Sequence, residues 1–171
     1  KVLICAQNSP EWCFAFYGAM RCEAIVIPLD AQSTKKEIEY VINDCRPDIV
    51  FVSDDKKKMF SDIELQGGRL MTKDDVVLSD DDNIPATDIP LRGKDDVMLI
   101  NYTSGTTGNP KGVMLTFNNV MFNVDSVSKQ VPIFQPDSNV MVLLPLHHIL
   151  PLLGSLVAPL YMGGTLHIAE A

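Results

Sequence analysis

Residues 97–113 read VMLINYTSGTTGNPKGV, an apolar run followed by a loop with three glycines, four serine or threonine side chains and one lysine. Glycines let backbone amides approach a bound group closely. Hydroxyl groups donate hydrogen bonds without carrying charge, and lysine adds a compact positive charge. A strand that leads into such a loop predicts a cradle for an anion with many oxygens, and it favours a polyphosphate.

The loop differs from the two common nucleotide-binding motifs. A P-loop has its lysine directly after the last glycine and a hydroxyl residue after the lysine, whereas here Asn109 and Pro110 separate Gly108 from Lys111. A G-x-G-x-x-G dinucleotide motif is also missing from the sequence. An unrelated kinase or NTPase is therefore disfavoured. So is a Ser-His-Asp hydrolase at Ser104, because no G-x-S-x-G elbow surrounds that serine.

Residues 1–53 alternate strand and helix signals. Apolar runs predict strands at residues 2–6, 24–29 and 49–52. Capping pairs predict two intervening helices that begin at Asn8–Glu11 and at Thr34–Glu37. This β-α-β-α-β order, with nearly continuous apolar strands, predicts an α/β fold with a parallel sheet covered by helices.

The rest of the chain divides into two regions. Residues 54–96 are polar and charged, and they predict peripheral structure with one short strand at residues 69–72. Residues 97–171 contain the loop, a helix predicted from about residue 116 to 131, and an apolar stretch over residues 138–169. That stretch carries no charged residue except histidines, but prolines and glycines interrupt it too often for a membrane span. A buried strand-helix-strand unit is the better prediction.

Composition excludes some functions. The formal net charge of −8 argues against a nucleic-acid-binding surface. The four cysteines, Cys5, Cys13, Cys22 and Cys45, show no C-x-x-C spacing and no histidine at metal-ligand spacing. They predict buried reduced thiols, no metal site and a cytoplasmic protein. A secretory signal or transit peptide is not visible in the sequence.

Residues 102–113 resemble the phosphate loop YTSGTTGxPKGV of the adenylate-forming (AMP-binding) enzymes at every fixed position. That family includes acyl-CoA synthetases, firefly luciferases and peptide-synthetase adenylation domains. Residues 8–29, the block LPLHHI at 144–149 and the Gly-Gly turn at 163–164 are also similar to family blocks. One departure is Cys22-Glu23-Ala24, where the family commonly has a pair of small residues. The resemblance is weakest over residues 54–96, and it implies a fragment of the large N-terminal domain of an acyl-adenylate-forming enzyme.

The resemblance also implies an activity. A carboxylic acid, with a fatty acid favoured, would be activated by ATP to acyl-AMP with release of pyrophosphate, and the acyl group would then pass to CoA. It implies ATP, Mg²⁺ and CoA as the small-molecule partners. The implied phosphate-binding residues are Thr103, Ser104, Gly105, Thr106, Thr107, Gly108 and Lys111.

Two residues are implied to act in the reaction. Lys111 would offset the charge of the leaving pyrophosphate, and His148 would face the substrate carboxylate. His147 takes the place of a family aromatic, and we expect it to be an ordinary core or surface residue. The apolar residues 149–157 would suit either the wall of a pocket for an acyl chain or an ordinary buried helix.

Two alternatives remain open at this point: an amino-acid-activating adenylation domain and a non-catalytic nucleotide-binding fragment. The family's adenine, ribose and magnesium contacts and its C-terminal lysine are expected beyond residue 171. The fragment alone is therefore expected to be inactive. Peripheral membrane contact and the oligomeric state of the full-length enzyme stay open.

Overall fold

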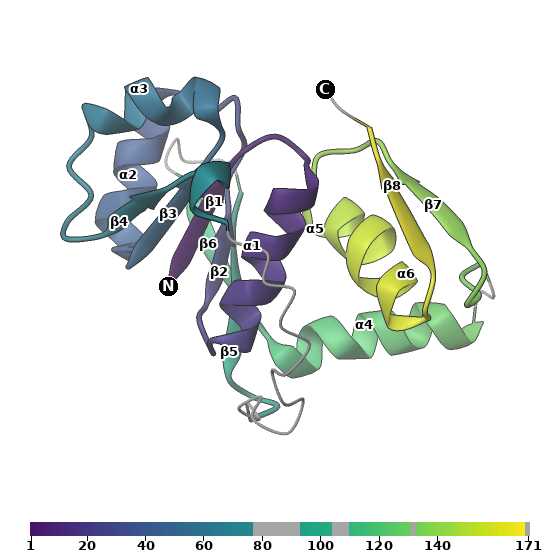
Figure 1. The fold of residues 1–171 in the computed structure, drawn as a ribbon. Coiled ribbons are helices and arrows are strands. Elements are labelled where there is room, and N and C mark those ends of the chain that lie inside the picture. The colour runs from purple at the N-terminus through teal and green to yellow at the C-terminus, as the bar shows by residue number, and fades with distance from the viewer. Residues whose placement is uncertain (77–92, 104–109, 131–132, 170–171) are drawn as a thin grey trace.

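The computed structural model describes residues 1–76, 93–103, 110–130 and 133–169, which form two β-sheets with helices around them (Figure 1). The strands are β1 (Val2–Cys5), β2 (Val26–Pro28), β3 (Ile49–Val52), β4 (Arg69–Met71), β5 (Val97–Thr103), β6 (Lys111–Thr116), β7 (Asn139–Val142) and β8 (Thr165–Ile168). The helices are α1 (Pro10–Arg21), α2 (Lys35–Cys45), α3 (Lys57–Ser61), α4 (Phe117–Gln130), α5 (Ile149–Pro151) and α6 (Ala158–Tyr161). A π-helical segment, η4 (Leu152–Val157), joins α5 to α6.

The main sheet has six strands in the order β4-β3-β1-β2-β5-β6. The first five strands in this order are parallel, and β6 pairs antiparallel with β5. A parallel crossover needs a dozen or more residues, so the short connection from Thr103 to Lys111 requires the antiparallel arrangement. The predicted α/β class with partly parallel sheets is confirmed.

Helices cover both faces of the main sheet. Val2 and Ile4 of β1 belong to a core cluster that includes residues of α1, α4 and η4, whereas Leu3 and Cys5 belong to a second cluster with residues of α2 and α3. Figure 1 shows α2 and α3 on one side of the sheet and α1 on the other. Burial on both faces explains why the strands read as continuous apolar runs.

The two predicted helix starts have different outcomes. Thr34 caps α2 in a reciprocal capping box with Glu37, as predicted. The cap of α1 is Ser9, whose Oγ accepts a hydrogen bond from the backbone N–H of Trp12 at 3.2 Å. The prediction of Asn8 as this cap is therefore wrong. Asn8 lies one residue before this cap, and its side chain binds Leu144 and Leu146 instead.

The polar region 54–96 contributes an edge to the main sheet. The predicted short strand is confirmed as β4, which pairs parallel with β3. The helix α3 was not predicted, because its five residues carry too short a pattern of apolar spacing. Residues 77–92 lie outside the described part of the chain.

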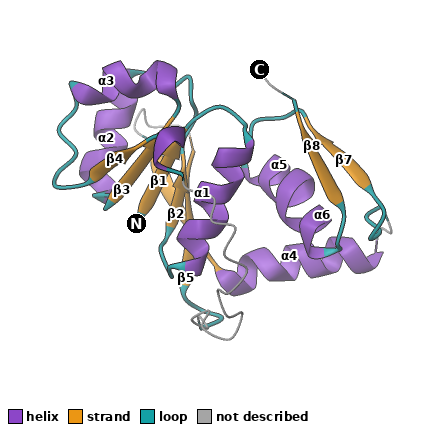
Figure 2. Cartoon of the chain, viewed as in Figure 1, coloured by secondary structure: helices purple, strands orange, loops and turns teal. Residues whose placement is uncertain are grey.

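The second sheet consists of β7 and β8, which pair in parallel and are joined through α5, η4 and α6. The strand-helix-strand order is as predicted, but complete burial of these strands is wrong. Met141 of β7 is 62% exposed, whereas Val142 is buried. One face of this sheet packs on the helices and the other is open. Figure 2 shows α1 lying between the two sheets.

Three of the four cysteines are buried thiols, as predicted. Burial raises the pKa of Cys5 to about 12 and the pKa of Cys13 and Cys45 to about 11. Cys22 differs, because it follows the last residue of α1 at the helix C-cap and is exposed. The prediction of burial is therefore wrong for Cys22.

Candidate functional site

The candidate site lies at one edge of the main sheet, where the parallel strands β1, β2, β3 and β5 all end. The chain leaves these strands at Ala6, Leu29 and Ser53, and Thr103 is the last residue of β5. In open α/β sheets this carboxyl edge is where ligands bind. Residues from four separate parts of the sequence therefore meet at the same edge.

The glycine-rich loop is closed by a strand pair. Thr103 of β5 stands opposite Lys111 of β6, and Tyr102 stands opposite Gly112. Both Thr103 and Lys111 are exposed. The remaining phosphate-binding candidates lie outside the described residues: Ser104, Gly105, Thr106, Thr107 and Gly108. Their assignment stays a prediction, and the structure fixes the two ends that hold the loop.

Gly112 is explained by packing. A Cβ at this position would lie 2.8 Å from Ile100 Cγ2 and 3.2 Å from Tyr102 Cζ. The hydroxyl of Tyr102 donates a hydrogen bond to the Asp44 carboxylate on α2, and burial together with this bond raises the pKa of the phenol. Tyr102 therefore ties β5 to α2 through Asp44, and Gly112 lets β6 pack closely against Ile100 and Tyr102.

The two adjacent histidines have different surroundings. His147 is largely buried, its Nε2 lies 3.7 Å from Asp30 Oδ2, and its backbone carbonyl accepts a 2.9 Å hydrogen bond from Asn101 Nδ2. Burial lowers the pKa of the His147 imidazole, the charge of Asp30 opposes this shift, and His148 adds to it. His148 is exposed at the position before α5, with its ring centroid 4.0 Å from that of His147.

These environments bear on the roles expected of the pair. A buried imidazole with a lowered pKa is neutral at pH 7. His147 is largely buried, and the expectation that it is an ordinary core or surface residue stays a prediction. The role of His148 toward a substrate carboxylate stays a prediction, although its exposure leaves the imidazole free to meet one.

Asn8 and Asn101 are site residues that the sequence analysis misread or missed. The Asn8 side chain donates to the Leu144 carbonyl at 2.9 Å and accepts from the Leu146 N–H at 3.0 Å. Asn101 was visible as a polar residue directly after the apolar run at residues 97–100. Its burial to 8% exposure is the structural counterpart of that signal.

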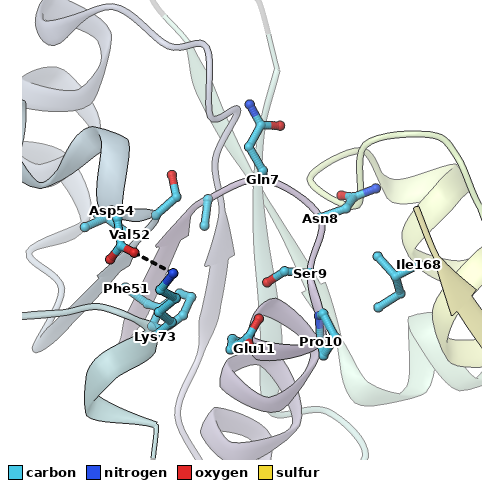
Figure 3. Close-up of a pocket in the computed structure, with 12 residues that line it drawn as sticks. Gln7, Asn8, Ser9, Pro10, Glu11, Phe51, Val52, Asp54, Lys73 and Ile168 are labelled. Atoms are coloured by element: carbon cyan, nitrogen blue, oxygen red, sulfur yellow. Dashed lines mark ion pairs between the residues drawn. The ribbon is translucent and has the colours of Figure 1, made fainter. Parts of the chain in front are cut away.

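A polar pocket of about 360 Å³ lies beyond the ends of β1 and β3 (Figure 3). The loop from Ala6 to Ser9 and the first two residues of α1 line one side, and Lys73, which forms a 2.8 Å ion pair with Asp54, lines another. Ile168 of the second sheet completes the wall. Figure 3 shows Asn8 on this loop with its side chain turned toward the second sheet.

Two apolar pockets lie along α4 and the α5–η4 segment, with volumes of about 360 and 240 Å³. Leu150 and Leu153 line both pockets, whereas Leu152 and Leu156 are buried in the core. The expectation of a buried helix at residues 149–157 is met in part, and the role of this segment as the wall of a pocket for an acyl chain stays a prediction. One face of this segment belongs to the core, and the other borders open apolar space.

Within residues 1–76, 93–103, 110–130 and 133–169, no group of three or more His, Cys, Asp or Glu side chains could hold a metal ion. Among those same residues, none of the helices has the length and apolar character needed to cross a bilayer.

Curated relatives at low identity include several CoA ligases. The chain is 28% identical over 155 residues to long-chain-fatty-acid–CoA ligase FadD13 of Mycobacterium tuberculosis, covering 87% of this chain and 31% of that protein. It is 29% identical over 172 residues to sulfoacetate–CoA ligase of Cupriavidus necator, covering 96% and 33%. Bacitracin synthase 2 of Bacillus licheniformis is 27% identical over 141 residues, covering 82% of this chain and 5% of that protein. The chain thus spans a third or less of the length of these relatives.

Solved structures share the fold. Apo MatB from Rhodopseudomonas palustris matches with a TM-score of 0.81 at 23% identity, over 99% of this chain and 34% of that one. The inhibitor-bound N-terminal domain of FACL13 from Mycobacterium tuberculosis also gives 0.81, at 24% identity over 98% and 43%. The family model described as AMP-binding enzyme matches residues 1–171. This chain therefore belongs to the AMP-binding enzyme family.

Proposed function

We propose that, in the full-length protein, this chain forms part of an AMP-forming acid–thiol ligase. The reaction activates a carboxylic acid with ATP and passes the acyl group to CoA. One observation carries the proposal. The Thr103–Lys111 pair that closes the glycine-rich loop and the His147–His148 pair meet at one sheet edge, linked by the 2.9 Å bond from Asn101 to the His147 carbonyl. The CoA ligases among the relatives support it.

The chemistry explains why these residue types are needed. A carboxylate oxygen attacks the α-phosphorus of ATP, and the bond to pyrophosphate breaks. The CoA thiol then attacks the acyl carbon, and AMP leaves with the former carboxylate oxygen. Donors aimed at the β- and γ-phosphates act most strongly as charge moves onto the leaving group. Lys111 supplies such a charge at the end of the loop.

The loop positions and polarises but transfers no proton. Serine and threonine hydroxyls titrate far above neutral pH. Magnesium, when bound, would neutralise phosphate charge. The described residues provide no cluster of carboxylates for it, so its ligands are expected elsewhere in the full-length protein.

The apolar pockets favour a fatty acid as the substrate. They lie beside α5, which begins directly after His148, so an acyl chain in them would place its carboxylate near the histidines. The relatives act on different acids, from long-chain fatty acids to sulfoacetate. The similarity to bacitracin synthase 2 keeps an amino-acid substrate as the second candidate. The buried reduced thiols support a cytoplasmic location.

Lys111→Ala in the full-length enzyme tests the proposed role of the loop. We expect acid-dependent ATP–pyrophosphate exchange to fall by about 100-fold, because a donor to the leaving group is lost. The thioester half-reaction, started from synthetic acyl-AMP, should keep its rate. Lys129→Ala is the matched control, since Lys129 is an exposed lysine that pairs with Asp125 on α4. Equal losses in the two half-reactions would contradict the role of Lys111.

A further inference from the structure

The segment 144–148 connects β7 of the second sheet to α5 and is held mainly by side chains. Its internal backbone bond runs from the His148 N–H to the Pro145 carbonyl at 3.3 Å, which is long. Shorter bonds come from outside. Asn8 binds Leu144 and Leu146, and Asn101 binds His147. The backbone immediately before His148 is thus fixed by two asparagines, Asn101 of β5 and Asn8 of the connection from β1 to α1.

Asn8 holds the segment at two points. Its amide nitrogen donates to the Leu144 carbonyl and its amide oxygen accepts from the Leu146 N–H, so both ends of the amide are used. Pro145, which lies between these two residues, has no N–H to donate. The asparagine amide therefore replaces the backbone partner that a neighbouring strand would supply.

Asn101 holds the next residue from another strand. It lies two positions before Thr103, where the loop begins, and its side chain is buried. A buried amide without a partner is destabilising, which makes the bond to the His147 carbonyl costly to lose. Asn101 thus links the strand that carries the phosphate loop to the residue before His148.

We propose that Asn8 and Asn101 are positioning residues for acid activation, which hold the 144–148 segment so that the His148 imidazole faces the end of β5. This inference rests on the proposed function. Reacting groups lose rate steeply with small displacements, and a shift of about 1 Å can cost 100-fold. Because Asn101 and the loop share β5, one strand sets the position of both the triphosphate site and the histidine.

A double-mutant cycle separates positioning from simple stabilisation. Asn101→Leu keeps the branched shape of the side chain and removes the amide donor. We expect it to lower acid-dependent ATP–pyrophosphate exchange by about tenfold through kcat in the wild-type enzyme, and by less than about twofold in a His148→Ala background. Asn8→Leu, which changes a less buried side chain, should behave in the same way and covers the case in which Asn101→Leu does not fold.

Thr72→Val is the matched control. Thr72, like Asn101, has a buried polar side chain, and it lies far along the chain from the histidines, where it binds Asp75. Thr72→Val should leave acid-dependent ATP–pyrophosphate exchange per folded molecule unchanged, both in the wild-type enzyme and in the His148→Ala enzyme. Additive effects of Asn101→Leu and His148→Ala, or an equal loss in Thr72→Val, would overturn the positioning role. Wild-type exchange in His148→Ala alone would instead overturn the histidine's role in the proposed function, and the inference with it.

Discussion

Two neighbouring imidazoles in this chain have opposite environments, because the main sheet holds one and leaves the other at the surface. His147 packs beside Asp30 and presents its carbonyl to Asn101, whereas His148 is exposed before α5. In the described structure the His147 Nε2 is buried without a hydrogen-bond partner. A buried nitrogen without a partner is costly. Because burial also disfavours the charged imidazole, the free energy of unfolding should depend on pH.

His147→Phe should flatten the loss of stability at acid pH. The folded pKa of His147 lies below its ordinary value of 6.5, so the unfolded chain binds the proton more readily. Its contribution is therefore present above pH 6.5 and is lost as pH falls below that value. Melting temperatures of wild type and His147→Phe at pH 8 and pH 5.5 would measure this. Asp30→Asn, which removes the charge that opposes the shift, should steepen the loss, and a lessened loss would contradict the account.

At the scale of the element, the sequence predicted what local patterns determine. The sequence defined α2 correctly from its cap, Thr34 with Glu37, and from its buried positions Ile38, Val41 and Ile42. These residues lie within a few turns of one another along the chain, so a local pattern is enough to identify them. Asn8–Glu11 has the same spacing, yet Ser9 caps α1. The choice between Asn8 and Ser9 depends on Leu144 and Leu146, which are remote in sequence.

The same limit applies to strands and to the site. The apolar run of β7 predicted burial, but which side chains are covered depends on β8 and the helices, and Met141 is left open. The motif located the loop from Thr103 to Lys111, since glycine spacing is local. It could not reveal that Asn101 holds the His147 carbonyl, because that contact joins residues 46 positions apart.

Thr34→Ala should loosen α2 locally. The side-chain oxygen of Thr34 accepts from the Glu37 N–H, and the Glu37 carboxylate accepts from the Thr34 N–H. The bonds that the Thr34 N–H and hydroxyl donate to this carboxylate lower the pKa of Glu37. Losing such a cap costs about 1 kcal/mol, or about fivefold in amide protection. Hydrogen exchange of a peptide over residues 35–45 would measure it. Lys36→Ala, an exposed first-turn change, is the control, and equal protection in both variants would contradict the cap.

At the scale of the whole molecule, the open face of the second sheet and the apolar pockets lie on the same part of the chain. Leu150 is 77% exposed and Leu143 is 68% exposed, next to the pockets along α4. Exposed apolar surface of this kind favours association.

We expect residues 1–171 alone, incubated with ATP, Mg²⁺, palmitate and CoA, to form neither AMP nor thioester. Turnover near that of a full-length ligase would show that the adenine, ribose and magnesium contacts and the C-terminal lysine, which are expected beyond residue 171, are not needed.

The proposed ligase function requires that the substrate carboxylate attack the α-phosphorus of ATP. The direct measurement uses the full-length enzyme with a fatty acid labelled with ¹⁸O in both carboxylate oxygens, followed by mass spectrometry of the nucleotide and phosphate products. An acyl-adenylate route leaves one ¹⁸O in AMP, because the bridging oxygen departs with AMP when the thiol attacks. We predict AMP that carries one ¹⁸O and unlabelled pyrophosphate. Formation of ADP with ¹⁸O in inorganic phosphate would indicate an acyl phosphate and would contradict the account.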